Sequence, residues 1–516
     1  MRSISSIIIK ALSLLLILSL LMPAAQATTM DDNLTLAMVS VKTQYLNPLV
    51  SQEREFQSLT ALMYEGLYSL NDDYVPEYCL AKRVDCSSDG KTWTVTMRED
   101  IYFHDGSPCT AYDVEATIHE ILRLANENQG QYAQLKYFIK SVKAQKATEL
   151  VIEASRSYMG LEYALTFPVL PKNQVNAMNP LGTGPYKQDH FVPGNYLYLS
   201  AFEKWHEPTP FVKEINVLFK ETNREVITEY EFNRVDAAIT RSASAGQYQT
   251  SLTNLNITYR TRQLETLQLN RSAFPLEDVN IRKAIRYAID LDGICNLIYM
   301  GMAQRTDTPL PSGTWMYRDN DSAHVYNPEK ARQLLKEAGW SYLDDDEILD
   351  KVVGDAVKHL QLRIHVYEEQ DNSVRVQVAH MISDDLKAVG INAPVHTESF
   401  ASIAERLQNR NYDMCIAAFQ MDVAPDPGFL LMSANTGNYT GYRSSQMDKL
   451  FKELRTATDQ STYQNLLYQI QDLFIEDCPF ICMYYRNGAL LTRKVFTTVR
   501  DVREPEILRG IESVGL

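Results

Sequence analysis

Residues 374–419 read VRVQVAHMISDDLKAVGINAPVHTESFASIAERLQNRNYDMCIAAF, and this stretch decides the fold class. Apolar residues first recur at helical spacing as far as Gly390 and then alternate over 391–395, which is typical of a helix followed by a strand. A second helical pattern around Ile403 leads into an apolar strand over 412–419. Helix–strand–helix–strand order predicts a partly parallel sheet covered by helices, and therefore an α/β fold.

The chain on either side of this stretch divides in character near Asn270. Downstream, Asn327-Pro328 predicts the start of another helix, a last helix is expected over 463–474, and 479–485 is expected to be a buried strand. Upstream, strands predominate, as in Lys91–Arg98, where Trp93, Val95 and Met97 alternate with threonines. Thr110-x-x-Asp113 resembles a capping box before an amphipathic helix.

The composition is that of a folded globular protein. Of the 516 residues, 45% are hydrophobic and 22% are charged, and the length suggests two to four domains. The formal charge of −15 argues against nucleic acid as a partner, because binding to phosphates requires an excess of basic residues. The 30 tyrosines outnumber the 17 phenylalanines, which provides much surface able to pack and hydrogen-bond at once.

The first 27 residues have the pattern of an export signal. Arg2 and Lys10 precede the apolar run 11–22, and an A-x-A cleavage site ends at Ala27. The run is shorter than the roughly 20 residues that span a membrane, so we expect cleavage near Ala27 and a secreted mature protein. An uncleaved N-terminal anchor is the less favoured alternative.

The sequence shows no catalytic constellation and no complete metal site, so we predict no catalytic residues, no metal and no cofactor. His104-Asp105-Gly106 and Gly182-Thr-Gly184 are interpreted as a turn and a backbone corner, because neither has the partners of a nucleophile or phosphate motif. The acidic run 344–347 lacks the spacing of a calcium loop. The seven cysteines are interpreted as buried or disulfide-bonded, and Cys79 and Cys86 are close enough in sequence to close a local loop.

An ordered series of segments resembles one family across nearly the whole mature chain. These segments are Tyr45–Pro48, Tyr64–Leu67, 76–114 with Asp89–Trp93 and Phe103–Gly106, Gly182–Tyr186, Phe202–Trp205, Val279–Asp290, Tyr326–Gly339 and Asp385–Ile391. In this order they are similar to family 5 extracellular solute-binding proteins of ABC importers, the oligopeptide- and dipeptide-binding class.

The resemblance implies two α/β lobes joined by a hinge of two crossing strands, with the ligand enclosed between them. It is the large, type II form of the periplasmic binding protein fold, in which one lobe carries an extra subdomain. The implied boundaries are 28–60, 183–269 and 484–516 for lobe I, 61–182 for its extra subdomain, and 270–483 for lobe II. The hinge crossings are expected near 267–270 and 481–485.

The resemblance also implies ligand-binding residues. Peptide binders of this family hold the ligand ammonium with an Asp a few residues after an aromatic-bearing strand of lobe II, which matches Phe419 and Asp422. Counting from the following Asp-Pro pair instead leaves Asp426 as the alternative anchor. The hinge positions Asn270 and Tyr485 are further candidates.

Two further features bear on the ligand. Dipeptide-binding members carry an Arg before the helix at Val374, where this chain has carboxylates, Glu369 among them, which favours a longer peptide or a cationic ligand. The spacing after Pro48 places Gln52 and Arg54 near the cleft, where Arg54 is either a replacement positive group or one half of a surface ion pair.

The function implied is that of a monomeric periplasmic protein that captures peptides by lobe closure. It would deliver them to the permease and ATPase subunits of an ABC transporter at the inner membrane. The alternatives are a non-peptide ligand, such as a nickel complex or another metal chelate, a cationic metabolite or an oligosaccharide. An exported hydrolase with an unrecognised site, and a peptide-sensing receptor or chaperone, are further alternatives from other classes.

Overall fold

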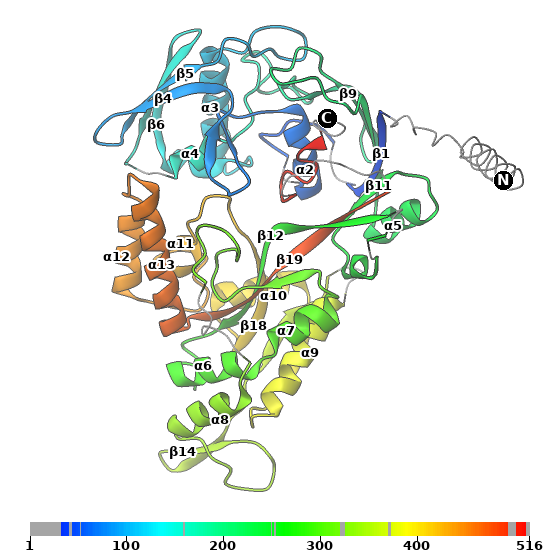
Figure 1. The fold of residues 1–516 in the computed structure, drawn as a ribbon. Helices are drawn as coiled ribbons and strands as arrows, with labels where there is room; N and C mark the ends of the chain where they lie inside the picture. Colours follow the sequence, from blue (N-terminus) through cyan, green and yellow to red (C-terminus); the bar gives the residue numbers. More distant parts are fainter. Residues whose placement is uncertain are drawn as a thin grey trace, which may run out of the picture.

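The computed structural model describes residues 32–40, 44–51, 53–157, 160–248, 250–251, 254–319, 326–369, 373–493 and 502–511 (Figure 1). The expected export signal over 1–27 and the candidate Gln52 lie outside the described residues. Among the described residues, no helix is both long and apolar enough to cross a membrane.

One large mixed sheet runs through the middle of the molecule. Its strand order is β17-β16-β18-β12-β19-β11-β1-β10-β9-β8, and β13 pairs with β19 beside this path. The strands are β1 (Asn33–Val39), β8 (Tyr186–Val192), β9 (Tyr196–Ala201), β10 (Glu214–Lys220), β11 (Ala237–Thr240), β12 (Leu255–Leu269), β13 (Ala303–Arg305), β16 (Ile364–Tyr367), β17 (Val395–Glu398), β18 (Met414–Gln420) and β19 (Phe480–Thr492).

The segment that decided the fold class folds as predicted. Its apolar periodicity becomes α9 (Val374–Lys387), and Gly390 follows with a positive φ of 88°, a conformation that favours glycine. The second helical pattern becomes α10 (Phe400–Asn409) and leads into β18. Since β16 pairs in parallel with both β17 and β18, the partly parallel sheet is confirmed.

Strands β12 and β19 connect the two lobes. They pair antiparallel over almost their full length, from Leu255 opposite Thr492 to Gln268 opposite Phe480, with register shifts between Arg260 and Leu264 and between Glu265 and Thr266. In Figure 1 they are the long green and red strands between the lobe with β1 and β11 and the lobe with α6 (Val279–Ala288), α8 (Pro328–Glu337) and α9. The expected architecture of two α/β lobes and two crossing strands is therefore confirmed.

A separate four-stranded antiparallel sheet, ordered β4-β5-β7-β6, lies at the top left of Figure 1 and is covered by α3 (Ala111–Asn126). The capping box at its start is present, because Thr110 N donates to Asp113 Oδ2 at 2.8 Å. Strand β5 buries Trp93, Val95 and Met97, as their alternation predicted. The other strands are β4 (Ala81–Cys86), β5 (Thr92–Met97), β6 (Ile139–Lys146) and β7 (Glu149–Ala154).

The remaining helices cover the lobes. Asn327 caps α8 by accepting a hydrogen bond from Lys330 N at 2.9 Å, as Asn327-Pro328 predicted. The last expected helix forms as α13 and is longer than predicted at both ends. The remaining elements of four or more residues with regular α or β structure are α2 (Arg54–Met63), α4 (Leu161–Ala164), α5 (Asn223–Glu231), α6 (Val279–Ala288), α8 (Pro328–Glu337), α11 (Gly428–Leu431), α12 (Ser445–Leu454), α13 (Gln460–Asp477), β14 (Asp350–Val353) and β15 (Ala356–His359); two short strands, β2 (Tyr68–Leu70) and β3 (Pro76–Tyr78), form a hairpin.

The structure confirms that His104-Asp105-Gly106 is a turn and that Gly182-Thr-Gly184 is a corner of the backbone. His104 lies in a turn whose Gly106 has φ +83°, and its ring joins this turn to the glycine corner. Gly182 N donates to His104 Nδ1 at 3.3 Å, and His104 Nε2 contacts Gly184 O at 3.1 Å. A Cβ on Gly184 would lie 2.7 Å from the carbonyl carbon of Met63, so this position excludes any larger residue.

The cysteines correct one expectation. All seven are free thiols, so the local disulfide between Cys79 and Cys86 is not formed. Cys86 is exposed on β4, and Cys79 is half-buried in the turn before it. The other five are buried, in agreement with the interpretation of the cysteines as buried residues. These five are Cys109, Cys295, Cys415, Cys478 and Cys482.

Candidate ligand-binding cleft

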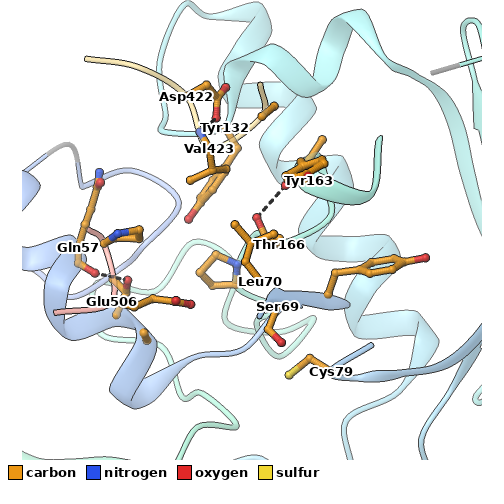
Figure 2. A pocket seen from close by; sticks show the side chains of 18 of the residues that line it. Gln57, Ser69, Leu70, Cys79, Tyr132, Tyr163, Thr166, Asp422, Val423 and Glu506 are labelled. Carbon is orange, nitrogen blue, oxygen red and sulfur yellow. Dashed lines mark hydrogen bonds between the residues drawn. The ribbon is translucent and has the colours of Figure 1, made fainter. Parts of the chain in front are cut away.

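A cleft of about 1420 Å³ separates α2 and the four-stranded subdomain from the loop after β18 (Figure 2). Its walls come from distant parts of the chain: residues 57–79, 131–138, 155–168, 205–208, 420–435 and 503–509 contribute most of the lining. Pockets for small molecules typically measure about 300–1,000 Å³, so this cleft has room for a larger ligand.

Tyrosines are the commonest aromatic residues of the cleft wall. Seven line it: Tyr64, Tyr68, Tyr74, Tyr78, Tyr132, Tyr137 and Tyr163. In Figure 2, Tyr132 lies beside Asp422 and Val423. Burial raises the pKa of the Tyr132 phenol, nearby Arg262 acts to lower it, and Asp422 acts to raise it, so this phenol remains a neutral hydrogen-bonding group. Part of the tyrosine excess in the sequence is thus concentrated where a ligand would be packed and hydrogen-bonded at once.

The two candidate anchors behave differently. Asp422 lines the cleft, is exposed, and accepts a hydrogen bond from its neighbour Val423 N at 2.7 Å. Asp426 also lines the cleft, but it holds the Arg455 guanidinium through two contacts of 2.6 and 3.0 Å and caps Gly428 N. The charge of Asp426 is therefore already compensated, and Asp422 is the better placed of the two to meet a cation.

Phe419 lies behind the cleft wall and is not part of its lining. Its ring stacks on Tyr439 with centroids 6.0 Å apart and meets Phe429 edge-on at 6.3 Å. Phe429 itself lines the cleft. The structure therefore places Phe419 where it supports a lining residue.

Arg54 is committed to a buried carboxylate. Its guanidinium contacts Glu504 with Nε–Oε1 and Nη2–Oε2 distances of 2.8 Å, and Arg241 joins the same carboxylate at 3.0 Å. Burial acts to raise the pKa of Glu504, but the charges of Arg241 and Arg54 outweigh it and lower the pKa. Glu504 lines the cleft and Arg54 does not, so the ion-pair alternative describes Arg54, with a buried partner in place of a surface one.

The other predicted residues lie around the hinge, outside the lining of the main cleft. Asn270 donates to the carbonyls of Arg410 and Tyr412, at 2.9 and 2.8 Å, and so ties the end of β12 to the start of β18. Tyr485 is buried and donates to Pro309 O at 3.2 Å, beside a small adjoining cavity of about 50 Å³.

Glu369 belongs to a charge cluster at the hinge. It lies 2.9 Å from Arg375 Nη1 and 3.2 Å from Arg486 Nη1. Arg375 also binds Glu265 of β12, with Nη2–Oε1 at 2.7 Å and Nε–Oε2 at 3.1 Å. Burial acts to raise the pKa of Glu265, but the two arginines outweigh it and lower the pKa. The charge of Glu369 is thus compensated by arginines, one of which comes from α9 itself.

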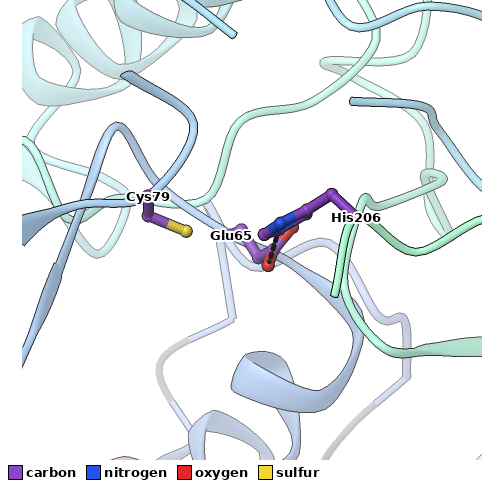
Figure 3. Close-up of side chains that lie close together, drawn as sticks. All are labelled: Glu65, Cys79 and His206. Atoms are coloured by element: carbon purple, nitrogen blue, oxygen red, sulfur yellow. Dashed lines mark hydrogen bonds and ion pairs between the residues drawn. The ribbon is translucent and has the colours of Figure 1, made fainter. Parts of the chain in front are cut away.

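One group of cleft residues was not predicted from the sequence. Glu65 follows α2, Cys79 follows β3, and His206 lies between β9 and β10, yet the structure brings the three together (Figure 3). Burial, with the nearby charge of Glu65, raises the pKa of the Cys79 thiol well above its usual value. Each is a single residue with no spacing pattern to the others, so nothing in the sequence links them.

Comparison with known proteins identifies the family. The model of bacterial extracellular solute-binding proteins, family 5, middle region, matches residues 75–441, which is more than half of the chain. The chain belongs to this family. It is accordingly a solute-binding protein of the ABC transport class.

Relatives of this solute-binding protein are named for different ligands. The oligopeptide-binding protein AppA of Bacillus subtilis is 24% identical over 86% of this chain and 84% of the relative. A nickel-binding periplasmic protein of Escherichia coli is 26% identical over 80% and 82% of the two chains. In three dimensions, NikA of Brucella suis in complex with Fe(III)-EDTA has a TM-score of 0.78 at 20% identity, with 93% and 99% of the chains covered. The likeness shows the fold and leaves the ligand open.

Proposed function

We propose that this solute-binding protein captures peptides longer than two residues and delivers them to the permease of an ABC importer. The observation that carries the proposal is the exposed carboxylate of Asp422, which forms no ion pair among the described residues, on the wall of a tyrosine-rich cleft of about 1420 Å³. A ligand ammonium enclosed in such a cleft needs a carboxylate partner, since an unpaired buried charge is strongly unfavourable. The volume favours an oligopeptide over a dipeptide.

We propose that closure is a rigid-body movement of the lobes about β12 and β19. In this proposal residues 28–60, 183–269 and 484–516 form lobe I, 61–182 form its extra subdomain, and 270–483 form lobe II. Support comes from the cleft, because its lining draws on all three of these units. We further propose that the protein is exported to the periplasm by cleavage near residue 27 and acts as a monomer.

The test of the ligand class is native mass spectrometry of the purified protein, before and after mild denaturation. Peptides of three or more residues released on denaturation would support the proposal. A released sugar, or a metal chelate without peptide, would refute it.

The test of the anchor uses a released peptide in two forms. Asp422→Asn is expected to weaken binding of the peptide with a free amino terminus by about 10- to 100-fold, the worth of a charge-assisted hydrogen bond. The same substitution should leave binding of the N-acetylated peptide nearly unchanged. Asp355→Asn, an exposed aspartate in the turn between β14 and β15, is the matched control. Equal affinity of Asp422→Asn and Asp355→Asn for the free peptide would refute the role of Asp422.

A further inference from the structure

Three potential metal ligands converge on one wall of the cleft. Glu65, Cys79 and His206 each offer one ligand atom, and these atoms all lie within 4.8 Å of one another. All three residues line the cleft. In Figure 3 the Cys79 sulfur points toward the Glu65 carboxylate, which in turn meets the His206 ring.

The hydrogen bonds around this group hold two ligands in place and leave other atoms unsatisfied. Glu65 Oε1 contacts His206 Nε2 at 2.8 Å and accepts a hydrogen bond from Trp205 Nε1 at 3.1 Å. Glu65 Oε2 and His206 Nδ1 are buried and have no hydrogen-bond partner, although Glu207 Oε1 lies 3.6 Å from Nδ1. The His206 side chain is 5% exposed and that of Glu65 is 10% exposed. A buried polar atom without a partner calls for an explanation, and an ion bound beside it is one.

We propose that Glu65, Cys79 and His206 form a binding site for a divalent transition-metal ion of the zinc class. Thiolate, imidazole and carboxylate are the three ligand types that Zn²⁺ takes in proteins. The thiolate favours such borderline-soft ions over Mg²⁺ or Ca²⁺, which prefer sites made of oxygen alone. Two anionic ligands balance the charge of the ion. Binding replaces the S–H bond of Cys79 by a sulfur–metal bond and releases the proton to solvent.

The surroundings supply the outer contacts that such a site requires. A metal-bound histidine usually donates its other ring N–H to a carboxylate, and Glu207 is placed to accept from Nδ1 when Nε2 binds the ion. Trp205 fixes the orientation of the Glu65 carboxylate from behind. Tetrahedral coordination at about 2.0–2.3 Å needs ligand atoms about 3.3–3.8 Å apart, so movements of about 1 Å by these side chains complete the site.

Three protein ligands leave one tetrahedral position, and because all three residues line the cleft, this position would open onto it. A site of this kind keeps water or a donor atom of a bound molecule in the fourth position. The ion would therefore take an amine, imidazole or thiol group of the solute. The site would add affinity for ligands that carry such groups at the opposite side of the cleft from Asp422.

The test is titration of the purified, metal-stripped protein with Zn²⁺ by calorimetry and with Co²⁺ by absorption. We expect one Zn²⁺ per chain and a thiolate-to-cobalt charge-transfer band. Cys79→Ser and His206→Gln should each weaken Zn²⁺ binding by at least about 100-fold, and Cys79→Ser should abolish the band. Should these variants fail to fold, a band that is retained in both the folded Cys86→Ala and the folded Cys109→Ala proteins decides the matter, because Cys86 is the exposed thiol and Cys109 is the other thiol that the Glu65 charge influences. Loss of the band in either of these two variants would overturn the assignment to Cys79.

Two control variants separate this site from adventitious binding. Cys86→Ala removes the exposed neighbouring thiol, and His359→Gln disrupts the exposed group Asp344, Asp346 and His359, the other cluster of this kind among the described residues. Both should bind Zn²⁺ like the natural protein. The proposal is overturned if the natural protein takes up no Zn²⁺ at micromolar concentration, or if His359→Gln loses the ion while Cys79→Ser retains it. Peptide binding measured without metal tests the proposed function independently.

Discussion

Substitution of Arg375 by Met is expected to destabilise the protein by about 3 kcal/mol. Arg375 and Glu265 are 1% and 0% exposed, and the substitution removes both guanidinium contacts to the Glu265 carboxylate. Removing one partner of a buried ion pair costs about 3–5 kcal/mol, because the other charge stays buried without compensation. Glu265 would retain a hydrogen bond from Gln263 at 2.8 Å and the Arg486 guanidinium at 4.0 Å, which places the loss at the lower end.

The assay is a double-mutant cycle measured by urea unfolding. Glu265→Met combined with Arg375→Met replaces both charges by apolar groups of similar size, an exchange that is often nearly neutral. The double variant should therefore be more stable than the sum of the single losses by about 2 kcal/mol or more. Arg83→Ala, which breaks an ion pair with side chains 69% and 51% exposed, is the control and should change stability by no more than about 0.5 kcal/mol.

The reasoning fails if Arg375→Met costs less than about 1 kcal/mol, or if the losses of the two single variants simply add. Additive losses would mean that the two side chains are stabilised separately by their other neighbours. For Arg375 these are the Glu369 carboxylate, 2.9 Å from Nη1, and the Tyr367 ring, whose centroid lies 4.2 Å from the guanidinium carbon.

The remaining predictions concern pH and the glycine corner. Burial lowers the pKa of His104 to about 4, so between pH 6.5 and 4 the unfolded chain binds a proton that the folded protein excludes. The free energy of unfolding should therefore fall as pH falls through this window. Measured by urea unfolding, its loss between pH 7 and 4.5 should be about 2–3 kcal/mol smaller for His104→Gln than for the natural protein. Equal losses would contradict the assignment. Gly184→Ala should cost about 2–3 kcal/mol, because its Cβ meets the backbone of Met63 and Leu62 at 2.7 and 2.8 Å. Gly354→Ala, which has φ +63° and open space around the Cβ, should cost less, and a larger loss there would show that close approach is not the cause at Gly184.

Features set by neighbouring residues were predictable from the sequence. The periodicity over 374–419, the cap at Asn327 and the turn at His104 all depend on contacts within a few residues, and the structure has each of them. The ends of the elements were predicted less accurately. Helix α13 was expected over 463–474 but extends over Gln460–Asp477, because Asp459 accepts a hydrogen bond from Thr462 N and so caps the helix before its first apolar residue.

Contacts between distant residues were not predictable from composition or spacing. Arg54 meets Glu504 across 450 positions, and Arg375 meets Glu265 across 110. A charged residue gives no sign in the sequence of which opposite charge it will be buried against. The resemblance placed Asp422 near the ligand, and the structure puts it on the cleft wall, while its role remains a prediction.

The position of β19 has a consequence for the biogenesis of the protein. This strand, near the C-terminal end of the chain, lies between β11 and β12 in the middle of the large sheet. During synthesis the ribosome must release almost the whole polypeptide before that gap can be filled. Strand β12 cannot complete its ladder earlier, so a nascent chain that stops short of Phe480 lacks one of the two strands that connect the lobes.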